Sequence, residues 1–594
     1  MTLDHGVVGN GSLLALVRQD SGIDWLCLPR FDSPSVFARL LDEERGGTWR
    51  FLCEGEAVEG TMRYVHNTNV LVTRFEHGDC AWDLFDFAPL LPEGLRQKAP
   101  RRLTRYVAPV KGTPRLTMEF EPKPDYARAE VRLVPGPVGL ELEGAGEPLH
   151  LFSNVPAPFL ATGQPFLLDR PRYFGLVYGH EPKRLYKDDV WRELDLTIAA
   201  WRQWAQSTAL PGFHDEAVLR SALCLALHQY QETGAIIAAT TTSVPETVGE
   251  PRTWDYRFCW LRDSVFTVEA LRRLAHFQEG INFVYFMRDV AEGGPLQPLY
   301  GIGGERDLPE MELDHLAGYK GTKPVRVGNQ AAEQAQHDLM GELVLCLRTL
   351  LMDPRVWLRN PSDWMPLVER MVDESIAASE KEDLGIWEYR GRPRLYTFSQ
   401  AMCWAAVHHG AAIARHFDQQ EQVQTWEREA ERLKARFMER AYNEELGMFT
   451  QAFDDEYADA SNLLLPSLGI VAPTDPKFLS TLERYREILV KDRGVMRYVH
   501  EDDFGTPKST FTICSFWWVE ALALAGHLDE AVATFEKLVA HSNPLGLLSE
   551  DIDAETGELC GNFPQAYTHV GLINAATTIG QLLRARESRF TAWS

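Results

Sequence analysis

The segment 188–204, DDVWRELDLTIAAWRQW, marks the point at which the character of the chain changes. Its apolar side chains recur with the period of about 3.6 residues that is typical of an amphipathic helix, at Val190, Leu194, Ile198, Trp201 and Trp204. The pair Pro211-Gly212 predicts where this helix ends. The sequence therefore predicts a helical linker over residues 188–212, between an N-terminal domain over 1–187 and a second domain over 213–594.

Before this linker the sequence predicts β-strands. Apolar and polar residues alternate over 116–121 and over 138–143, and a Pro135-Gly136 turn signal precedes the second run. No strong helical period interrupts this region, so βαβ units are not expected. An antiparallel β-sandwich is the predicted fold of the N-terminal domain.

After the linker, amphipathic segments alternate with loops, which predicts about twelve helices. Six helix hairpins closed into a ring, an (α/α)6 barrel, are the expected architecture of residues 213–594. No repeat of fixed period is visible, which disfavours an open solenoid. The expected helices begin near Asp215, Leu261, Glu279, Gln330, Asp363, Thr397, Gln420, Tyr457, Pro476, Ser509, Asp529 and Gln565.

Composition excludes several classes of protein. The 594 residues include 60 Lys and Arg against 85 Asp and Glu, a formal charge of −25, which argues against binding to nucleic acid or to an anionic membrane surface. No run of roughly 20 apolar residues and no signal-peptide pattern is present, so a cytoplasmic location is expected. The nine cysteines form no Cys-x-x-Cys pair and are expected to be free thiols. The expected partner is a small, uncharged or cationic molecule.

Four loops of the helical half are long and rich in Gly, Pro, Trp and charge, which is typical of loops that carry function. They span residues 254–263, 300–329, 384–390 and 545–569. Within 385–390, GIWEYR, Glu388 stands between Trp387 and Tyr389. Desolvation by two aromatic rings would raise the pKa of this carboxyl and suit a general acid. The alternative is an ion pair with Arg390 on a surface turn.

The loop 547–553, LLSEDID, gathers carboxylates that are followed by Glu555 and Glu558. One of them could stay ionised beside a water molecule as the general base of an inverting glycosidase. Calcium binding and a merely solvated acidic loop are the alternatives. The third loop, with its preceding residue, is 253–263, TWDYRFCWLRD. Here Arg262 and Asp263 stand near Trp and Tyr residues, a combination that suits a sugar with polar edges and apolar faces. A structural ion pair of Arg262 explains this pattern equally well.

Other catalytic motifs are incomplete or missing from the sequence. The glycines at 301–304 lack the dinucleotide fingerprint, and no His-Glu-x-x-His or Gly-x-Ser-x-Gly motif is present. Carboxylate acid/base chemistry is therefore the best-supported enzymatic option.

Taken together, six segments resemble the prokaryotic branch of glycoside hydrolase family 15. They are 23–32, 254–263, 315–329, 385–390, 514–517 and 561–566, and the resemblance covers essentially the whole chain in the family's order. This family includes glucoamylases, glucodextranases, isomaltose-type glucohydrolases and trehalases. The resemblance implies an N-terminal β-sandwich, a helical linker and an (α/α)6 barrel, together with hydrolysis of an α-glucoside by inversion.

The resemblance also implies a role for individual residues. Glu388 resembles the family's general acid and Glu550 its general base. A further set resembles residues that hold the sugar or shape the wall of its site: Arg262, Asp263, Trp260, Trp387, Arg497, Tyr319, Pro324 and Arg326. No cofactor and no metal is implied. Tyr389 stands where some eukaryotic relatives carry a second acid, which makes a fungal-type preference for starch less secure.

The first function expected is therefore exo-acting hydrolysis of short α-gluco-oligosaccharides, with release of β-D-glucose from the non-reducing end. The alternative within the same reaction class is a trehalase, and no residue of the sequence separates the two. A non-catalytic glucan-binding or regulatory protein is the alternative of another class, although it would be expected to lack one of the two carboxylates. The sequence leaves open the preferred linkage, the chain length accepted, whether the protein forms a homo-oligomer, and a need for calcium or phosphate.

Overall fold

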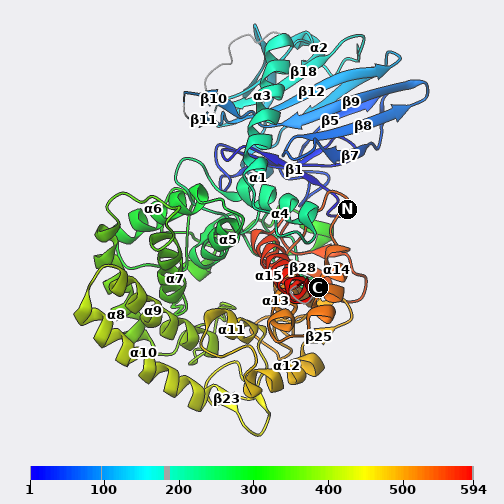
Figure 1. The fold of residues 1–594 in the computed structure, drawn as a ribbon. Coiled ribbons are helices and arrows are strands. Elements are labelled where there is room, and N and C mark those ends of the chain that lie inside the picture. The colour runs from blue at the N-terminus through cyan, green and yellow to red at the C-terminus, as the bar shows by residue number, and fades with distance from the viewer. Residues whose placement is uncertain (1, 95, 147, 180–186, 592–594) are drawn as a thin grey trace.

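The computed structural model describes residues 2–94, 96–146, 148–179 and 187–591. Its N-terminal part is built from antiparallel sheets, as the alternating patterns predict (Figure 1). An eight-stranded sheet has the order β14-β15-β16-β18-β12-β9-β8-β7, and two four-stranded sheets have the orders β17-β13-β5-β6 and β1-β2-β3-β4. The two runs singled out by alternation are strands β13 (Arg115–Glu121) and β15 (Gly139–Glu143).

The faces of these sheets pack on one another through large apolar side chains, for example Phe51 of one four-stranded sheet and Phe174 of the eight-stranded sheet, whose ring centres lie 4.9 Å apart. In β13, Leu116, Met118 and Phe120 are buried, and Met118 stands opposite Phe51 of β5 (Thr48–Cys53) in the register. The remaining strands are β1 (Gly6–Gly9), β2 (Leu14–Val17), β3 (Ile23–Cys27), β4 (Ser35–Phe37), β6 (Glu56–Ala57), β7 (Thr61–Tyr64), β8 (Leu71–His77), β9 (Cys80–Phe87), β10 (Leu91–Glu93), β11 (Arg96–Lys98), β12 (Arg102–Lys111), β14 (Arg132–Pro135), β16 (Leu149–Ser153), β17 (Phe166–Leu167) and β18 (Arg172–Tyr178).

Helix α3 (Lys187–Gln206) connects the sheets to a ring of helices, where the change of period predicts a linker (Figure 1). Six inner elements pack side by side around the ring: α5 (Leu261–Arg273), α7 (Leu339–Leu351), α9 (Thr397–His416), the short α11 (Leu465–Leu468) with its preceding 3-10 turn, α13 (Thr512–Leu524) and α15 (Ala566–Thr591). Six outer helices cover them: α4 (Asp215–His228), α6 (Gln278–Glu292), α8 (Met365–Ala378), α10 (Gln420–Arg440), α12 (Pro476–Ile488) and α14 (Leu528–Val539). This is the expected (α/α)6 barrel.

Two expected helices differ from prediction. The helix expected near Gln330 is only a 3-10 turn, Gln330–Glu333, and α7 begins later, at Leu339. The Asn329 side chain accepts a hydrogen bond from the Ala331 N–H and initiates this short turn, which ends at Gln334, where the backbone is extended. The helix expected near Tyr457 is likewise short, because α11 ends at Gly469, which adopts a left-handed conformation with φ of 83°.

The sheets pack directly on the loops of the barrel. The Trp25 indole N–H donates to the Thr240 carbonyl at 2.9 Å. Arg257, fully buried in the loop 254–263, donates to the Tyr126 hydroxyl at 2.8 Å and to the Ser33 carbonyl at 2.8 Å. The N-terminal domain therefore supports the loop that carries several of the predicted site residues.

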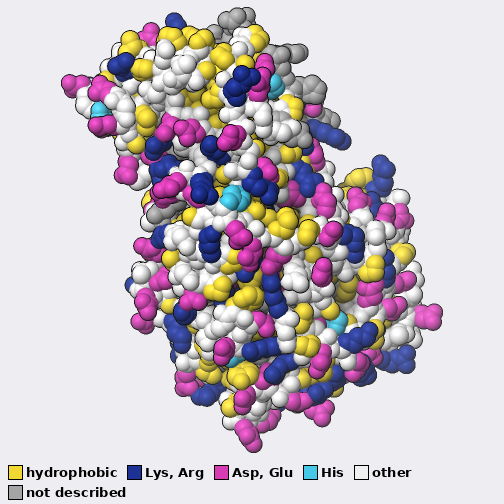
Figure 2. Space-filling view, turned by 180° about the vertical axis from the view of Figure 1, so that it is seen from behind, with side chains coloured by type: hydrophobic (Ala, Val, Ile, Leu, Met, Phe, Trp, Pro, Cys, Tyr) yellow, Lys and Arg dark blue, Asp and Glu magenta, His cyan; other side chains and the backbone are white. Residues whose placement is uncertain are grey.

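The surface carries both signs of charge. Figure 2 shows Lys and Arg side chains interspersed with Asp and Glu over the face that it presents. Among the described helices, none has the length and apolar character needed to cross a lipid bilayer.

Candidate active site

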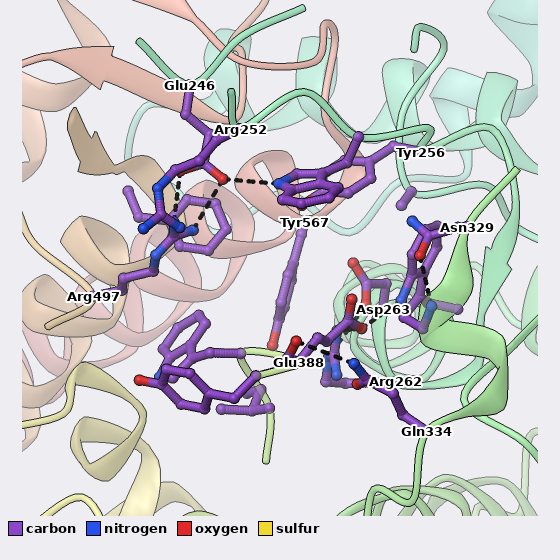
Figure 3. A pocket seen from close by; sticks show the side chains of 18 of the residues that line it. Glu246, Arg252, Tyr256, Arg262, Asp263, Asn329, Gln334, Glu388, Arg497 and Tyr567 are labelled. Carbon is purple, nitrogen blue, oxygen red and sulfur yellow. Dashed lines mark hydrogen bonds and ion pairs between the residues drawn. The ribbon is translucent and has the colours of Figure 1, made fainter. Parts of the chain in front are cut away.

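One cavity lies at the ends of the inner helices where these helices begin. It is lined by Arg262 and Asp263 in the first turn of α5, by Phe511 directly before α13 and by Gln565 and Tyr567 at the start of α15. Loop residues complete the wall, among them Glu246, Trp254, Tyr256, Glu388 and Arg497 (Figure 3). Because the N-terminus of a helix carries a partial positive charge, this arrangement favours carboxylates and sugar hydroxyl oxygens in the cavity.

Glu388 extends into the cavity from the loop between α8 and α9. Its Oε1 accepts hydrogen bonds from the Trp260 indole N–H at 2.7 Å and from the Gln336 amide at 3.4 Å, and Nη2 of Arg262 lies 3.3 Å away. The residue adopts a left-handed backbone conformation with φ of 59°, which is costly for a side chain that is not glycine. Such strain at a residue held by three donors is typical of a functional position.

The immediate neighbours of Glu388 do not enclose it as the sequence suggests. The Trp387 indole N–H turns to the Asp459 carboxylate, at 3.0 and 2.9 Å from its two oxygens, and Tyr389 stacks on Tyr396. The aromatic partner of Glu388 is instead Trp260, from another loop. The alternative pairing with Arg390 is not formed, because Arg390 donates to Glu310 at 2.8 Å.

Arg262 is the centre of a buried cluster of charges. Its Nε lies 3.3 Å from Oδ2 of Asp263, and its Nη1 lies 3.9 Å from Oδ2 of Asp338, the residue before α7. Burial raises the pKa of Asp263 to about 6, although the Arg262 charge opposes this rise. Both interpretations of this motif, a structural ion pair and a sugar-binding pair, agree with the geometry. Arg262 pairs with carboxylates, and it also lines the cavity together with Asp263.

Glu550 directly precedes strand β28 (Asp551–Asp553), which pairs with β27 (Ser509–Phe511) and β29 (Leu559–Cys560). Its side chain is fully buried, and Oε2 accepts the Asn562 N–H at 3.0 Å. Oε1 is also buried and has no hydrogen-bond partner among the described residues. A Cβ atom at Gly561 would lie only 2.7 Å from Oε2 of Glu550, so glycine at this position leaves room for the carboxylate.

Glu246 is a further carboxylate of the site, one that the sequence does not mark. It pairs with Arg497 at 2.6 Å and accepts the Trp254 indole N–H at 3.3 Å (Figure 3). Burial and, after it, the negative charge of Glu246 raise the pKa of Glu550 to about 8, although the hydrogen bond from Asn562 opposes the rise. The segment before Glu246 has no periodic pattern, and its pairing with a residue far along the chain could not be read from the sequence.

Tyr256 lies close to the carboxylates of Glu550, Glu246 and Glu388. Burial raises the pKa of its phenol well above the ordinary value, and the charges of Glu550, Glu246 and Glu388 act in the same direction. Its ring also packs edge-on against Trp260, with ring centres 5.3 Å apart. Tyr256 is therefore a common neighbour of Glu388 and Glu550, although these two residues are distant in the sequence.

The other expected residues fall into two groups. Trp260, Trp387 and Arg497 line the cavity, as do Arg262 and Asp263. Tyr319 and Arg326 are buried but are not among its lining residues, and Arg326 donates instead to the backbone carbonyls of Pro251 and Thr253. Tyr567 is a lining residue that the sequence does not mark, and its buried hydroxyl has no hydrogen-bond partner in the described part of the chain.

The aspartates of the acidic loop after Glu550 make separate hydrogen bonds with different partners. Asp553 accepts hydrogen bonds from the N–H groups of Glu555 and Thr556 within its own turn, and Asp551 accepts the Ser509 hydroxyl at 2.9 Å. Within the described ranges, no group of three or more His, Cys, Asp or Glu side chains has the arrangement of a metal site.

Comparison with known proteins gives two family matches. The model for glycosyl hydrolases family 15 matches residues 212–577, and the model for the trehalase-like N-terminal domain matches residues 3–156. The first match covers the barrel that contains the cavity, and the second covers most of the sheet domain.

Individual relatives match over nearly the whole chain. A protein named trehalase from Mycobacterium tuberculosis is 34% identical, over 98% of this chain and 90% of the relative. One named trehalase from Thermoplasma volcanium is 31% identical, over 99% of this chain and 95% of the relative. Among solved structures, a bacterial glucoamylase complexed with acarbose superposes with a TM-score of 0.72 at 13% identity, covering 98% of this chain and 94% of that one, and it shares the fold.

Proposed function

The chain belongs to glycosyl hydrolases family 15 and is a glycoside hydrolase; from this premise we propose that it is a trehalase, which hydrolyses α,α-trehalose to two glucose molecules with inversion at one anomeric carbon. The observation that carries the proposal is the similarity to proteins named trehalase over both domains, at 34% and 31% identity. The trehalase-like match over residues 3–156 supports the same choice. Trehalose, which the sequence predicted only as the alternative substrate, is therefore favoured as the substrate over short α-gluco-oligosaccharides.

Glu388 is proposed as the general acid. The hydrogen bonds described for its carboxyl fall on Oε1, and we assign the transferable proton to Oε2. This oxygen would protonate the glycosidic oxygen as the bond to the anomeric carbon breaks. Trp260, Gln336 and Arg262 hold the carboxyl in place, and such positioning supplies much of the rate enhancement of an enzyme.

Glu550 is proposed as the general base. Its Oε2 is fixed by the Asn562 N–H, and we assign to Oε1, which has no hydrogen-bond partner among the described residues, the proton of the attacking water. Glu550 itself is not among the lining residues, so this role requires water to reach it from the cavity past its neighbours Tyr256 and Glu246, which do line it. The base must be ionised to act, and Arg497 supplies positive charge that lowers its pKa. An inverting enzyme keeps its two carboxyl groups about 6.5–9.5 Å apart to leave room for this water.

The sugar of the cleaved bond is proposed to be held by Arg262 and Asp263, with Tyr567 as a further hydroxyl donor. All three line the cavity near Glu388 (Figure 3). A charged donor and acceptor pair matches the hydroxyl groups along one edge of a glucose ring. The rings of Trp387 and Tyr256 offer apolar faces to its C–H groups.

The test is a comparison of substrates at equal concentration. The purified protein is incubated with trehalose, maltose, isomaltose, kojibiose and nigerose, and the release of glucose is measured with time. The proposal expects trehalose to be cleaved with the highest kcat/KM. Preferred cleavage of maltose or isomaltose would replace it with the oligosaccharide hydrolase, and no cleavage of any of the five would favour a binding protein.

A further inference from the structure

A group of three charged residues lies over Trp254 at the cavity. The Glu310 carboxylate pairs with Arg390, Oε2 to Nη2, at 2.8 Å, and its Oε1 lies 3.5 Å from Nε of Arg326. Both guanidinium groups lie over the Trp254 ring, at 4.8 Å for Arg326 and 4.9 Å for Arg390 from its centre. Cation–π contact and ion pairing therefore hold the Arg390 side chain over the indole.

A second loop holds Arg390 from another direction. Its backbone N–H donates to Oδ2 of Asp503 at 2.8 Å, and its guanidinium lies 5.3 Å from the centre of the Phe504 ring. Phe504 in turn packs edge-on against Trp254, with ring centres 5.0 Å apart. Arg390 thus joins three loops: its own, the loop 300–329 with Glu310 and the loop that follows Arg497.

Arg390 lies close to the proposed general acid, Glu388. Only Tyr389 stands between the two residues in the chain, so their Cα atoms lie no more than about 7 Å apart. Both line the same cavity, together with Trp254, Asp503 and Phe504. Arg390 is exposed, whereas Glu388 is only partly exposed. If Glu388 protonates the glycosidic oxygen, the Arg390 side chain is within reach of the next hexose on the open side of the cavity. That is where the leaving sugar would lie.

We propose that Arg390, fixed by Glu310 and Asp503, closes the outer end of the cavity and restricts the substrate to a disaccharide. The inference rests on the proposed function, because it takes Glu388 as the acid at the cleaved bond. The guanidinium and the Asp503 carboxylate hydrogen-bond the hydroxyl groups of the leaving glucose, and the rings of Trp254 and Phe504, packed edge-on, block a third sugar. Specificity for a short substrate then comes from an element that excludes the longer one.

The test compares a disaccharide with the trisaccharide that extends it. The substrates are trehalose and maltosyl glucoside, which is trehalose carrying one further α-1,4-linked glucose, so that cleavage of the 1,1 bond releases glucose and maltose. The readout is the ratio of kcat/KM for the trisaccharide to that for the disaccharide. The variants are Arg390→Ala, which removes the closing group, and Glu310→Gln, which keeps the volume but loses the ion pair.

The wild-type protein is expected to discriminate strongly against the trisaccharide, and both variants are expected to raise the ratio by about tenfold or more. Arg394→Ala is the matched control, because Arg394 belongs to the same loop but pairs with Asp455 at 3.0 Å and does not line the cavity. Its ratio should equal that of the wild type. Should Arg390→Ala fail to fold, as seen by circular dichroism, Glu310→Gln decides.

Two results would overturn the inference. One is a wild-type protein that cleaves both sugars equally well, and the other is a pair of folded variants that leave the ratio unchanged. Its failure is distinguishable from that of the proposed function. If maltose is the disaccharide cleaved, the function is wrong, and the same ratio is then measured with maltotriose and maltose.

Discussion

The indole N–H of Trp260 donates a 2.7 Å hydrogen bond to Oε1 of Glu388. This contact joins the residue before helix α5 to the loop between α8 and α9, and it sets the orientation of the proposed acid. Trp260 is buried, so the hydrogen bond is shielded from competing solvent. In the proposed mechanism, Trp260 therefore fixes which oxygen of Glu388 faces the substrate.

Replacing Trp260 by Phe retains an aromatic ring but removes the donor. Glu388 becomes a carboxylate as it gives up its proton, and a hydrogen bond to a charged group is worth about 1.5–3 kcal/mol, so kcat is expected to fall roughly tenfold to a hundredfold with a smaller change in KM. Steady-state kinetics on trehalose measure this. Trp201→Phe is the control, since its buried indole N–H, on α3, has no partner among the described residues. Unchanged kcat in Trp260→Phe would show that the contact has no part in catalysis.

The two proposed catalytic carboxyls are expected to respond differently to the leaving group. Glu388→Gln and Glu550→Gln should each lower kcat on trehalose by about 10²–10⁴-fold, the usual contribution of acid/base catalysis. With α-glucosyl fluoride, whose leaving group needs no proton, Glu388→Gln should retain much of its activity, whereas Glu550→Gln should stay inactive. Glu382→Gln, at an exposed position in the same loop as Glu388, is the control. The reverse pattern would exchange the two roles.

Glu246→Gln is expected to move the pH profile of kcat/KM. The base acts only when ionised, so activity falls as pH decreases through the pKa of Glu550, which burial and the Glu246 charge raise. Removing that charge lowers the pKa of Glu550, and the acidic limb should move to lower pH. Glu250→Gln is the control, because Glu250 pairs with Lys508 away from the cavity. An acidic limb that stays in place or moves to higher pH would contradict the assigned base.

Glu342 gives a prediction about stability. On α7, one turn after Asp338, its side chain is fully buried, and neither oxygen has a hydrogen-bond partner among the described residues. Burial, followed by the Asp338 charge, raises its pKa well above the ordinary value. The folded state therefore binds this proton more tightly than the unfolded state, and its contribution to stability is lost as pH rises above the unfolded pKa.

Glu342→Gln cannot ionise, so its Tm should exceed that of the wild type at neutral pH by a few degrees, and the difference should grow between about pH 5 and pH 8. Differential scanning calorimetry over this range measures it. Glu374→Gln, at an exposed position on α8, should leave the pH dependence unchanged. A constant difference across the range would show that Glu342 is ionised in the folded protein.

Much of the fold follows from local patterns in the sequence. Alternation at 116–121 and the helical period at 188–204 depend on residues that are close in the chain, and the structure has β13 and α3 there. The prediction of a helix near Gln330 was wrong. Ala331 and Ala332 lie in a short turn and pack in a small cluster with Trp260, a contact between distant segments that a periodic pattern does not reveal.

The site itself was predictable only in part. Glu388 and Arg262 stand in loops of unusual composition, and the structure brings them to the same cavity. Glu246 and Tyr567 carry no local signal, because their importance comes from Arg497 and Asp263, which folding brings next to them. Nothing in the spacing of Glu310 and Arg390 indicates that they meet. Such pairings depend on the closure of the ring, not on any property of the separate segments.

The most direct test of the central claim is the anomeric form of the glucose released from trehalose. Proton NMR in the first minutes, before mutarotation, separates the α and β anomers. Inversion by Glu388 and Glu550 gives one β-glucose from the attacked sugar and one α-glucose from the leaving sugar, so equal amounts of the two anomers are expected. Release of α-glucose alone would show that configuration is retained and would contradict the single-displacement mechanism.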